Sequence, residues 1–168
     1  MTNDAATLAG TLADRSAWRA DRCPIGKALE VVGTRSAMLI LREAYYGTAR
    51  FDDFATRVGI TEAVAAARLR ELTAAGIFAR EPYREPGQRT RFEYRLTRKG
   101  LDLVPVVLGL FEWGGKYASP GGRPPVELTH DGCGEPVHVS VRCAAEHEVH
   151  LDEVVVSPAP RRRAAERR

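Results

Sequence analysis

Apolar residues recur at helical spacing along the first half of the chain and predict a series of short helices. Ile25, Leu29 and Val32 share one face of a helix whose first turn suits Pro24, a residue without a backbone N–H. Residues 36–45 are apolar almost all round, which is typical of a helix buried at the centre of a domain. We therefore expect an amphipathic helix followed by a central helix.

Two further helices with well-marked ends follow. The first has apolar residues at positions i, i+3, i+4 and i+7 and ends at Gly59; these residues are Phe51, Phe54, Ala55 and Val58. The second begins at Thr61, a good N-cap, with Glu62 in the first turn where the helix dipole favours an acid. Its inward-facing residues are expected to be Ala65, Leu69 and Leu72.

The hydrophobic pattern changes from helical to alternating after Gly76. Residues 77–80 and 92–96 predict two short strands. Residues 84–90 between them contain a Pro-Gly pair, which is typical of a hairpin turn. The sequence thus predicts a two-stranded hairpin with a polar tip.

A long last helix is expected to begin at Thr97, with Pro105 as a candidate bend. Two apolar stripes run along it, formed by Leu101, Val104, Leu108 and Phe111 and by Val107, Leu110 and Trp113. A small domain does not readily cover a helix this apolar. We expect a second copy of the chain to cover it, and burial within one chain is the alternative.

Together the elements predict an α+β, mainly helical fold: a winged helix-turn-helix core with a small C-terminal β appendage. Residues 1–20 are expected to form a lead, with Leu8, Leu12 and Ala13 on one face of a short helix. The core spans 21–119. The appendage spans 120–157, with β-type runs at 137–141 and 154–156, and a basic disordered tail spans 158–168.

The distribution of charge says more about partners than the formal net charge of +3 does. Residues 68–99 hold nine basic residues against four glutamates, whereas residues 121–156 hold two arginines against seven acids. A concentrated basic block is typical of a nucleic-acid-binding surface, and a solvated basic face is the alternative.

Two helices joined by residues 58–61 and followed by a hairpin predict binding to double-stranded DNA. In such a fold the second helix enters the major groove, and the hairpin tip reaches phosphates or the minor groove. The helix residues expected to face the groove are Thr61, Glu62, Ala63, Val64, Ala67 and Arg68. The expected contacts of the hairpin are Arg84, Arg89 and Arg91. For Arg68, an ion pair with Glu71 is the alternative.

The chain carries seven motifs in order: CPIGKALEVVG (23–33), LILRE (39–43), RFDDF (50–54), GIT (59–61), RLREL (68–72), FEYRLTRKG (92–100) and LVPV…FEWG (103–114). Across about 21–117 they resemble the HxlR family, a branch of the MarR-like regulators. The resemblance implies a dimeric winged-helix repressor or activator whose outer helices form the dimer interface. A small-molecule effector is expected in the groove between the dimer helices.

Two departures from the family pattern concern core packing. Arg35-Ser36 stands where the family usually has Lys-Trp, and Ala65-Ala66 stands where its recognition helix usually has Leu and Thr. The smaller side chains remove apolar bulk, so we expect local packing to differ while the DNA-binding plan is retained.

Cys23 precedes a helix start, where the positive end of the helix dipole stabilises a thiolate and makes it reactive. The resemblance adds that a cysteine at this place senses oxidants or electrophiles in some family members. A redox switch, for instance by an intersubunit disulfide, is therefore one interpretation of Cys23. A small buried apolar residue is the other.

The C-terminal region contains His130-x-x-Cys133 and Cys143-x-x-x-His147, two short pairs of zinc-ligand residue types. They resemble the small ribbon appended to longer family members, which usually ends in Cys-x-x-Cys. Glu146 stands where that last cysteine falls, so His147 would have to replace it. A zinc site, a metal-free remnant and a Cys133–Cys143 pair all stay open.

Enzymatic activity is not expected. The sequence has no Gly-rich phosphate loop, no nucleophile elbow and no carboxylate pair in a plausible cleft. Its apolar runs are too short for a membrane helix and its N-terminus lacks a secretory pattern, so a cytoplasmic location without a membrane partner is expected. The rival interpretation is a protein-interaction adaptor with a zinc-ribbon-like docking module.

Overall fold

The computed structural model describes residues 5–17, 23–84, 86–87 and 89–159. The chain divides into two compact units, residues 22–139 and residues 1–21 together with 140–168. This division differs from the boundary expected near residue 120. The difference arises because the first part of the C-terminal extension packs against the last helix of the core.

Four helices occupy the first part of the larger unit, and their ends lie within one or two residues of those expected. They are α1 (Pro24–Val32), α2 (Arg35–Tyr45), α3 (Phe51–Val58) and α4 (Glu62–Ala74). Thr34 caps α2, because its hydroxyl accepts a hydrogen bond from the Ala37 amide at 3.2 Å. Such a bond satisfies one of the amides that every helix start leaves unpaired.

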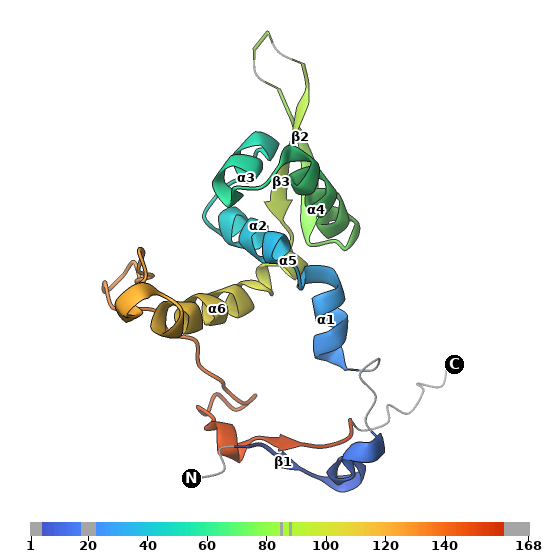
Figure 1. The fold of residues 1–168 in the computed structure, drawn as a ribbon, viewed down its shortest axis with the longest axis vertical. Helices are drawn as coiled ribbons and strands as arrows, with labels where there is room; N and C mark the ends of the chain where they lie inside the picture. Colours follow the sequence, from blue (N-terminus) through green and yellow to red (C-terminus); the bar gives the residue numbers. More distant parts are fainter. Residues whose placement is uncertain (1–4, 18–22, 85, 88, 160–168) are drawn as a thin grey trace. The chain divides into compact units, whose positions relative to one another are not determined.

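The expected hairpin is formed by β2 (Phe78–Tyr83) and β3 (Arg91–Leu96). The two strands are antiparallel, with Phe78 opposite Leu96 and Tyr83 opposite Arg91. Figure 1 shows the hairpin projecting beyond α3 and α4. It therefore forms the wing of a winged helix-turn-helix.

The core of the larger unit lies where α2, α3, α4 and the hairpin meet. Its largest fully buried side chains are Ile40, Leu41, Phe54, Leu69, Leu72, Ile77 and Phe78. Phe54 and Phe78 meet edge to face at a centroid distance of 6.1 Å, and Tyr94 meets both in the same way. Edge-to-face packing brings the positive ring edge against the negative ring face and stabilises the contact between α3 and the hairpin.

The single long helix expected after Thr97 is in fact two helices, α5 (Arg98–Leu101) and α6 (Val104–Tyr117). Pro105 lies in the first turn of α6. A proline inside a continuous helix would clash with the carbonyl four residues earlier and could not donate to it. Helix α5 therefore ends at Leu101, and α6 begins at Val104, so that Pro105 lies in a first turn where its missing N–H costs nothing.

The strand expected at 137–141 is absent from the described residues. Thr129 and Pro136 form an isolated bridge, and the Val137 amide donates to the Leu128 carbonyl at 2.8 Å. The next alternate amide, that of Val139, donates to the Glu112 carboxylate instead of to a neighbouring strand. The alternating valines thus bond to three different segments and not to one continuous neighbouring strand, since the Val141 carbonyl accepts from the Val149 amide at 2.9 Å.

The smaller unit brings the two ends of the described chain together. Strand β1 (Thr7–Leu8) pairs in parallel with β4 (Val155–Val156). The helix expected through Leu8, Leu12 and Ala13 is therefore wrong, since Leu8 lies in a strand and the other two lie in a 3₁₀ turn over Gly10–Ala13. The expected run at 154–156 does contain a strand. From residue 160 on, the tail lies outside the described residues.

The remaining short elements are 3₁₀ turns at Arg15–Ala17, Pro120–Gly122 and Leu151–Glu153. Within the described ranges, none of the helices combines the length and the apolar character needed to cross a bilayer.

Candidate nucleic-acid interface

The turn between α3 and α4 determines how α4 is presented. Gly59 adopts a left-handed conformation with a φ of 67°, which suits a residue without a Cβ. The amides of Gly59 and Ile60 both donate to the Ala55 carbonyl at 3.1 Å and close the end of α3. Thr61 then starts α4 as predicted, because its hydroxyl accepts a hydrogen bond from the Val64 amide at 3.3 Å.

Helix α4 buries one face and presents the other to solvent. Its core residues Ala65, Leu69 and Leu72 are almost completely buried, as the sequence predicts. The residues expected to face the groove are Thr61, Glu62, Ala63 and Val64, which are exposed, and Ala67 and Arg68, which are half-buried. These residues supply few hydrogen-bond donors or acceptors, so most of the exposed face offers shape and apolar contact.

Arg68 forms an ion pair with Glu71 on the same helix. This is the alternative that the sequence left open beside a DNA contact. The Nε atom of Arg68 is buried and has no hydrogen-bond partner. In this structure the Arg68 side chain lies along α4.

The far end of α4 is fixed to the hairpin by backbone and side-chain hydrogen bonds. The Ile77 amide donates to the Leu72 carbonyl at 2.9 Å, which closes a Schellman-type end. Thr97 at the end of β3 donates its hydroxyl to the Gly76 carbonyl at 2.7 Å. Lys99 of α5 donates to the Ala75 carbonyl, also at 2.7 Å. These contacts join the end of α4 to the base of the wing and to α5.

The wing presents the arginines that the sequence assigned to it. Arg84, Arg89 and Arg91 are all exposed. Arg91 lies 4.0 Å from Asp52 at the start of α3, and both side chains are more than half exposed. Water and salt screen such a pair strongly, so the pair does not prevent Arg91 from binding a phosphate.

A buried polar network that the sequence did not reveal supports the end of α2. Glu43 is 8% exposed and accepts hydrogen bonds from Arg42 at 2.6 Å and from the Thr48 hydroxyl at 3.3 Å. Arg57 of α3 in turn donates to the Thr48 hydroxyl at 3.0 Å. A buried carboxylate needs such partners, and here they join α2 to α3.

Helices α1 and α6 leave large apolar side chains in solvent. On α1, Ile25 is 70% and Leu29 is 57% exposed. On α6, Trp113 and Tyr117 are both more than 60% exposed, and their rings lie in tilted contact with centroids 5.7 Å apart. Exposed apolar surface of this extent usually marks an interface with another molecule.

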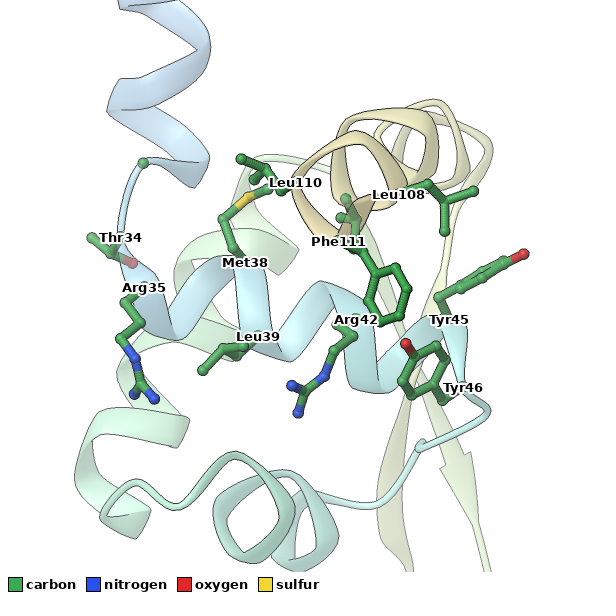
Figure 2. A pocket seen from close by; sticks show the side chains of 12 residues that line it. Thr34, Arg35, Met38, Leu39, Arg42, Tyr45, Tyr46, Leu108, Leu110 and Phe111 are labelled. Carbon is green, nitrogen blue, oxygen red and sulfur yellow. The ribbon is translucent and has the colours of Figure 1, made fainter. Parts of the chain in front are cut away.

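A cavity of about 420 Å³ lies between α2 and α6. Figure 2 shows Met38 and Leu39 on α2, Phe111 pointing from α6 toward α2, and Tyr45 and Tyr46 at the end of α2. The wall is mainly apolar, with Thr34, Arg35 and Arg42 as the polar contributors.

Cys23 is the N-cap residue of α1, as the sequence predicts, and it is half-buried. Its side chain makes no capping hydrogen bond, and Pro24 follows it in the first turn. The thiol thus lies at the positive end of the helix with part of its surface accessible to a small reagent.

The expected zinc ligands fall into two pairs, one in each unit. His130 Nδ1 and Cys133 Sγ lie 3.3 Å apart in the larger unit. Cys143 and His147 belong to the smaller unit, where the Cys143 amide donates to the His147 carbonyl at 3.0 Å. In the part of the chain that the structure describes, no three His, Cys, Asp or Glu side chains are grouped as metal ligands. The zinc site stays a prediction.

The helix-turn-helix at α3–α4 and the wing that follows it define a winged helix-turn-helix protein, the class to which many transcription factors belong. Residues 31–121 match the HxlR-like helix-turn-helix family. The chain belongs to this family, whose members regulate transcription.

Relatives and solved structures agree with this assignment. The uncharacterized HTH-type transcriptional regulator Rv3095 of Mycobacterium tuberculosis is 40% identical over 139 residues, which cover 81% of this chain and 85% of the relative. The crystal structure of PA1607, described as a candidate transcription factor, has a TM-score of 0.72 at 33% identity and covers 82% of this chain and 96% of that one. The reduced form of the redox regulator HypR has a TM-score of 0.50 at 34% identity, over 55% of this chain and 90% of its own.

Proposed function

We propose that the protein is a homodimeric repressor that binds a specific DNA operator in the cytoplasm. The observation that carries the proposal is the joint presentation of an exposed α4 face and an arginine-bearing wing, whose bases are joined by hydrogen bonds. In this class of fold, α4 enters the major groove while the wing contacts the neighbouring backbone or minor groove. A repressor of this kind acts by occupying its operator and excluding other proteins from it.

Dimerisation is supported by the apolar faces of α1 and α6, which a single larger unit leaves in solvent. A twofold dimer would cover these faces and would present two copies of α4 to one duplex. The half-sites would then lie about one helical turn, ~34 Å, apart.

A gel shift with DNA from upstream of the protein's own coding sequence tests operator binding. The proposal predicts a shifted complex that survives an excess of unrelated duplex. A complex that unrelated duplex removes completely would mean that binding lacks sequence specificity. A protein that shifts no duplex but captures a defined protein partner would favour the adaptor interpretation.

We also propose that Cys23 senses oxidants or electrophiles. Its support is the position of the thiol at the start of α1, its partial accessibility and the similarity of the chain to the redox regulator HypR. Treatment with diamide followed by mass spectrometry should show modified Cys23 together with reduced DNA affinity. Cys23→Ser should keep its affinity after the same treatment. Unmodified Cys23 in treated protein with unchanged affinity contradicts the switch.

The cavity between α2 and α6 is proposed as the place for a small, mainly apolar effector. The fluorescent probe anilinonaphthalene sulfonate is suitable for a first test because its emission rises in apolar sites. If the probe binds the folded wild-type dimer and Met38→Trp abolishes this binding, the site is supported. Probe binding that Met38→Trp leaves unchanged contradicts it.

The C-terminal extension is proposed to hold zinc through His130, Cys133, Cys143 and His147. The support is the pair of zinc-ligand motifs in the sequence and the contact between His130 and Cys133. Metal analysis of the purified protein should find close to one zinc per chain. A content below roughly a tenth of an equivalent contradicts the proposal, since structural zinc sites bind tightly.

A further inference from the structure

A basic cleft lies between α4 and the base of the wing, away from the wing tip. It has a volume of about 440 Å³ and is lined by Arg70, Thr73, Ala74, Arg80 and Tyr94. The first three of these residues come from the second half of α4, and the last two face each other across β2 and β3. Figure 1 shows α4 beside this hairpin. The cleft thus joins the two elements proposed to enter neighbouring grooves of DNA.

The Arg80 guanidinium lies over an aromatic ring. The guanidinium carbon lies 3.6 Å from the centroid of the Phe92 ring. Arg80, Phe92 and Tyr94 all lie on the same face of the hairpin. A guanidinium stacked flat on a ring keeps its N–H groups directed outward in its own plane. Because the stack already restricts the side chain, binding an anion through those N–H groups costs less conformational entropy.

The charges in the cleft are uncompensated, whereas most nearby basic residues are paired. Arg95 lies 2.8 Å from Glu93, and Arg98 lies 3.1 Å from Asp102. Neither Arg70 nor Arg80 has a carboxylate within ion-pair distance in the described ranges. Two unpaired cations lining one cleft repel each other, and an anion between them removes that repulsion.

We propose that Arg70 and Arg80 together bind one phosphate of the DNA backbone, at the point where the DNA strand passes from α4 to the wing. The inference rests on the proposed function. Guanidinium groups match the oxygens of a phosphate well, and backbone contacts position a protein on DNA without reading its sequence. The Thr73 hydroxyl donates to the Leu69 carbonyl at 2.6 Å, so the arginines supply the recognition.

The inference is tested by measuring how DNA affinity depends on salt concentration. The proteins compared are the full-length wild type, Arg70→Gln, Arg80→Gln and the double variant. One lost phosphate contact lowers the slope of log K against log salt by about 0.9. Because both arginines bind the same phosphate, the double variant should lose about 0.9 in slope, and each single variant less. The affinity loss should be equal for operator and unrelated duplexes. Arg80→Lys, which keeps the charge, should keep most of the slope.

Arg95→Gln is the matched control, because Arg95 lies on the opposite face of the hairpin and is paired with Glu93. It removes the same charge and should leave the slope unchanged. Thermal unfolding of each variant confirms that the fold is retained. If the double variant keeps the wild-type slope, the proposal is wrong. If its slope falls by about 1.8, the two arginines bind two different phosphates and not a shared one.

Inorganic phosphate separates a free anion from the DNA backbone as the source of the ligand. Calorimetric titration shows whether phosphate binds the wild type and whether this binding requires Arg70 and Arg80. If both are true, and the double variant keeps the wild-type salt slope for DNA, then the ligand is a free anion and the inference is wrong. If the wild type binds no duplex at all, the proposed function fails and the inference fails with it. If the wild type binds its operator and the double variant has the same salt slope as the wild type, the inference is wrong while the proposed function stands.

Discussion

At the residue scale, two glycines show how backbone packing constrains the larger unit. Gly100 is buried in α5, and a Cβ at this position would meet the carbonyl oxygen of Ile77 and the side chain of Leu96. Gly109 lies in α6, and apart from its chain neighbours and the adjoining backbone of the helix, no described atom lies within 4 Å of the corresponding position. The same substitution should therefore have opposite effects at the two positions.

Gly100→Ala is predicted to lower the free energy of unfolding by about 1–3 kcal/mol, because α5 must move away from a fixed backbone carbonyl. Gly109→Ala is predicted to raise it by up to about 1 kcal/mol, since alanine favours a helix more than glycine does. Urea unfolding monitored by circular dichroism measures both changes. Equal stability of Gly100→Ala and the wild type would show that α5 does not pack as described.

The cap of α4 gives a second prediction at this scale. Thr61→Ala removes the acceptor for the Val64 amide and should cost about 1 kcal/mol of stability. Thr61→Ser keeps the hydroxyl and should be close to neutral. Denaturant unfolding of the two variants tests this, and a similar loss in both would indicate that the methyl group of Thr61, and not its hydroxyl, stabilises the helix.

At the element scale, one carboxylate of α6 binds His138 and Val139 of the C-terminal extension. The Val139 amide donates to Glu112 Oε2 at 3.0 Å, and His138 Nδ1 lies 3.2 Å from Oε1. These two hydrogen bonds, the amide first, hold the pKa of Glu112 below its ordinary value of 4.5, and Lys116 acts in the same direction. A carboxylate with a lowered pKa stabilises the contact above the ordinary value and loses that contribution as the pH falls through the lowered one.

Hydrogen exchange at the Val139 amide should therefore be slow near neutral pH, and its protection should be lost as the pH falls through the lowered pKa of Glu112. Glu112→Ala should remove the protection at every pH. Glu135→Ala, a change of the same charge on the extension, is the control and should retain it. Protection in Glu112→Ala equal to that in the wild type would show that Glu112 does not hold the extension.

The wing is the second element with a direct test. Arg89→Ala should lower the slope of log K against log salt by about 0.9, because one phosphate contact is lost. The affinity for unrelated duplexes should fall by the same factor. Unchanged affinity and slope in this variant would mean that the wing tip does not contact DNA.

The sequence predicts elements well where the signal is local, and less well where it depends on distant parts of the chain. The cap at Thr61 and the apolar face of α4 follow from neighbouring residues, and the structure confirms both. The sequence predicts only a bend at Pro105, whereas the helix is interrupted between Leu101 and Val104, although the cause is local. The pairing of Thr7 with Val155 has no local signal, because the partners lie at opposite ends of the chain.

The candidate site divides in the same way. The arginines of the wing tip could be predicted because they follow a recognisable turn. The cleft of Arg70 and Arg80 could not, since it depends on the strand register that places Arg80 beside Tyr94 and on the packing of α4 against β2. The contact of Glu112 with Val139 is likewise a tertiary contact without a sequence pattern.

At the scale of the whole molecule, binding to two half-sites requires two chains, each presenting one copy of α4 and the wing. The apolar residues of α1 and α6 are the proposed contact between them. Their burial would also supply the largest favourable contribution to association, since free energy follows the apolar area removed from water.

Leu110→Glu is therefore predicted to convert the dimer into a folded monomer and to lower operator affinity at least tenfold. Leu110 is 54% exposed on α6, so the substitution leaves the core of the chain intact. Leu151→Glu, at a comparably exposed leucine in the smaller unit, should remain dimeric. Sedimentation velocity measures the oligomeric state, and a Leu110→Glu protein that remains a dimer would place the interface elsewhere.

Paired operator binding by a dimer is best tested by quantitative footprinting of the wild-type protein on the DNA upstream of its own coding sequence. A dimer should protect two half-sites, centred about one helical turn (~34 Å) apart, that fill together as the protein concentration rises. A single half-site that fills alone would rule out paired binding, and so would the absence of protection at low ionic strength.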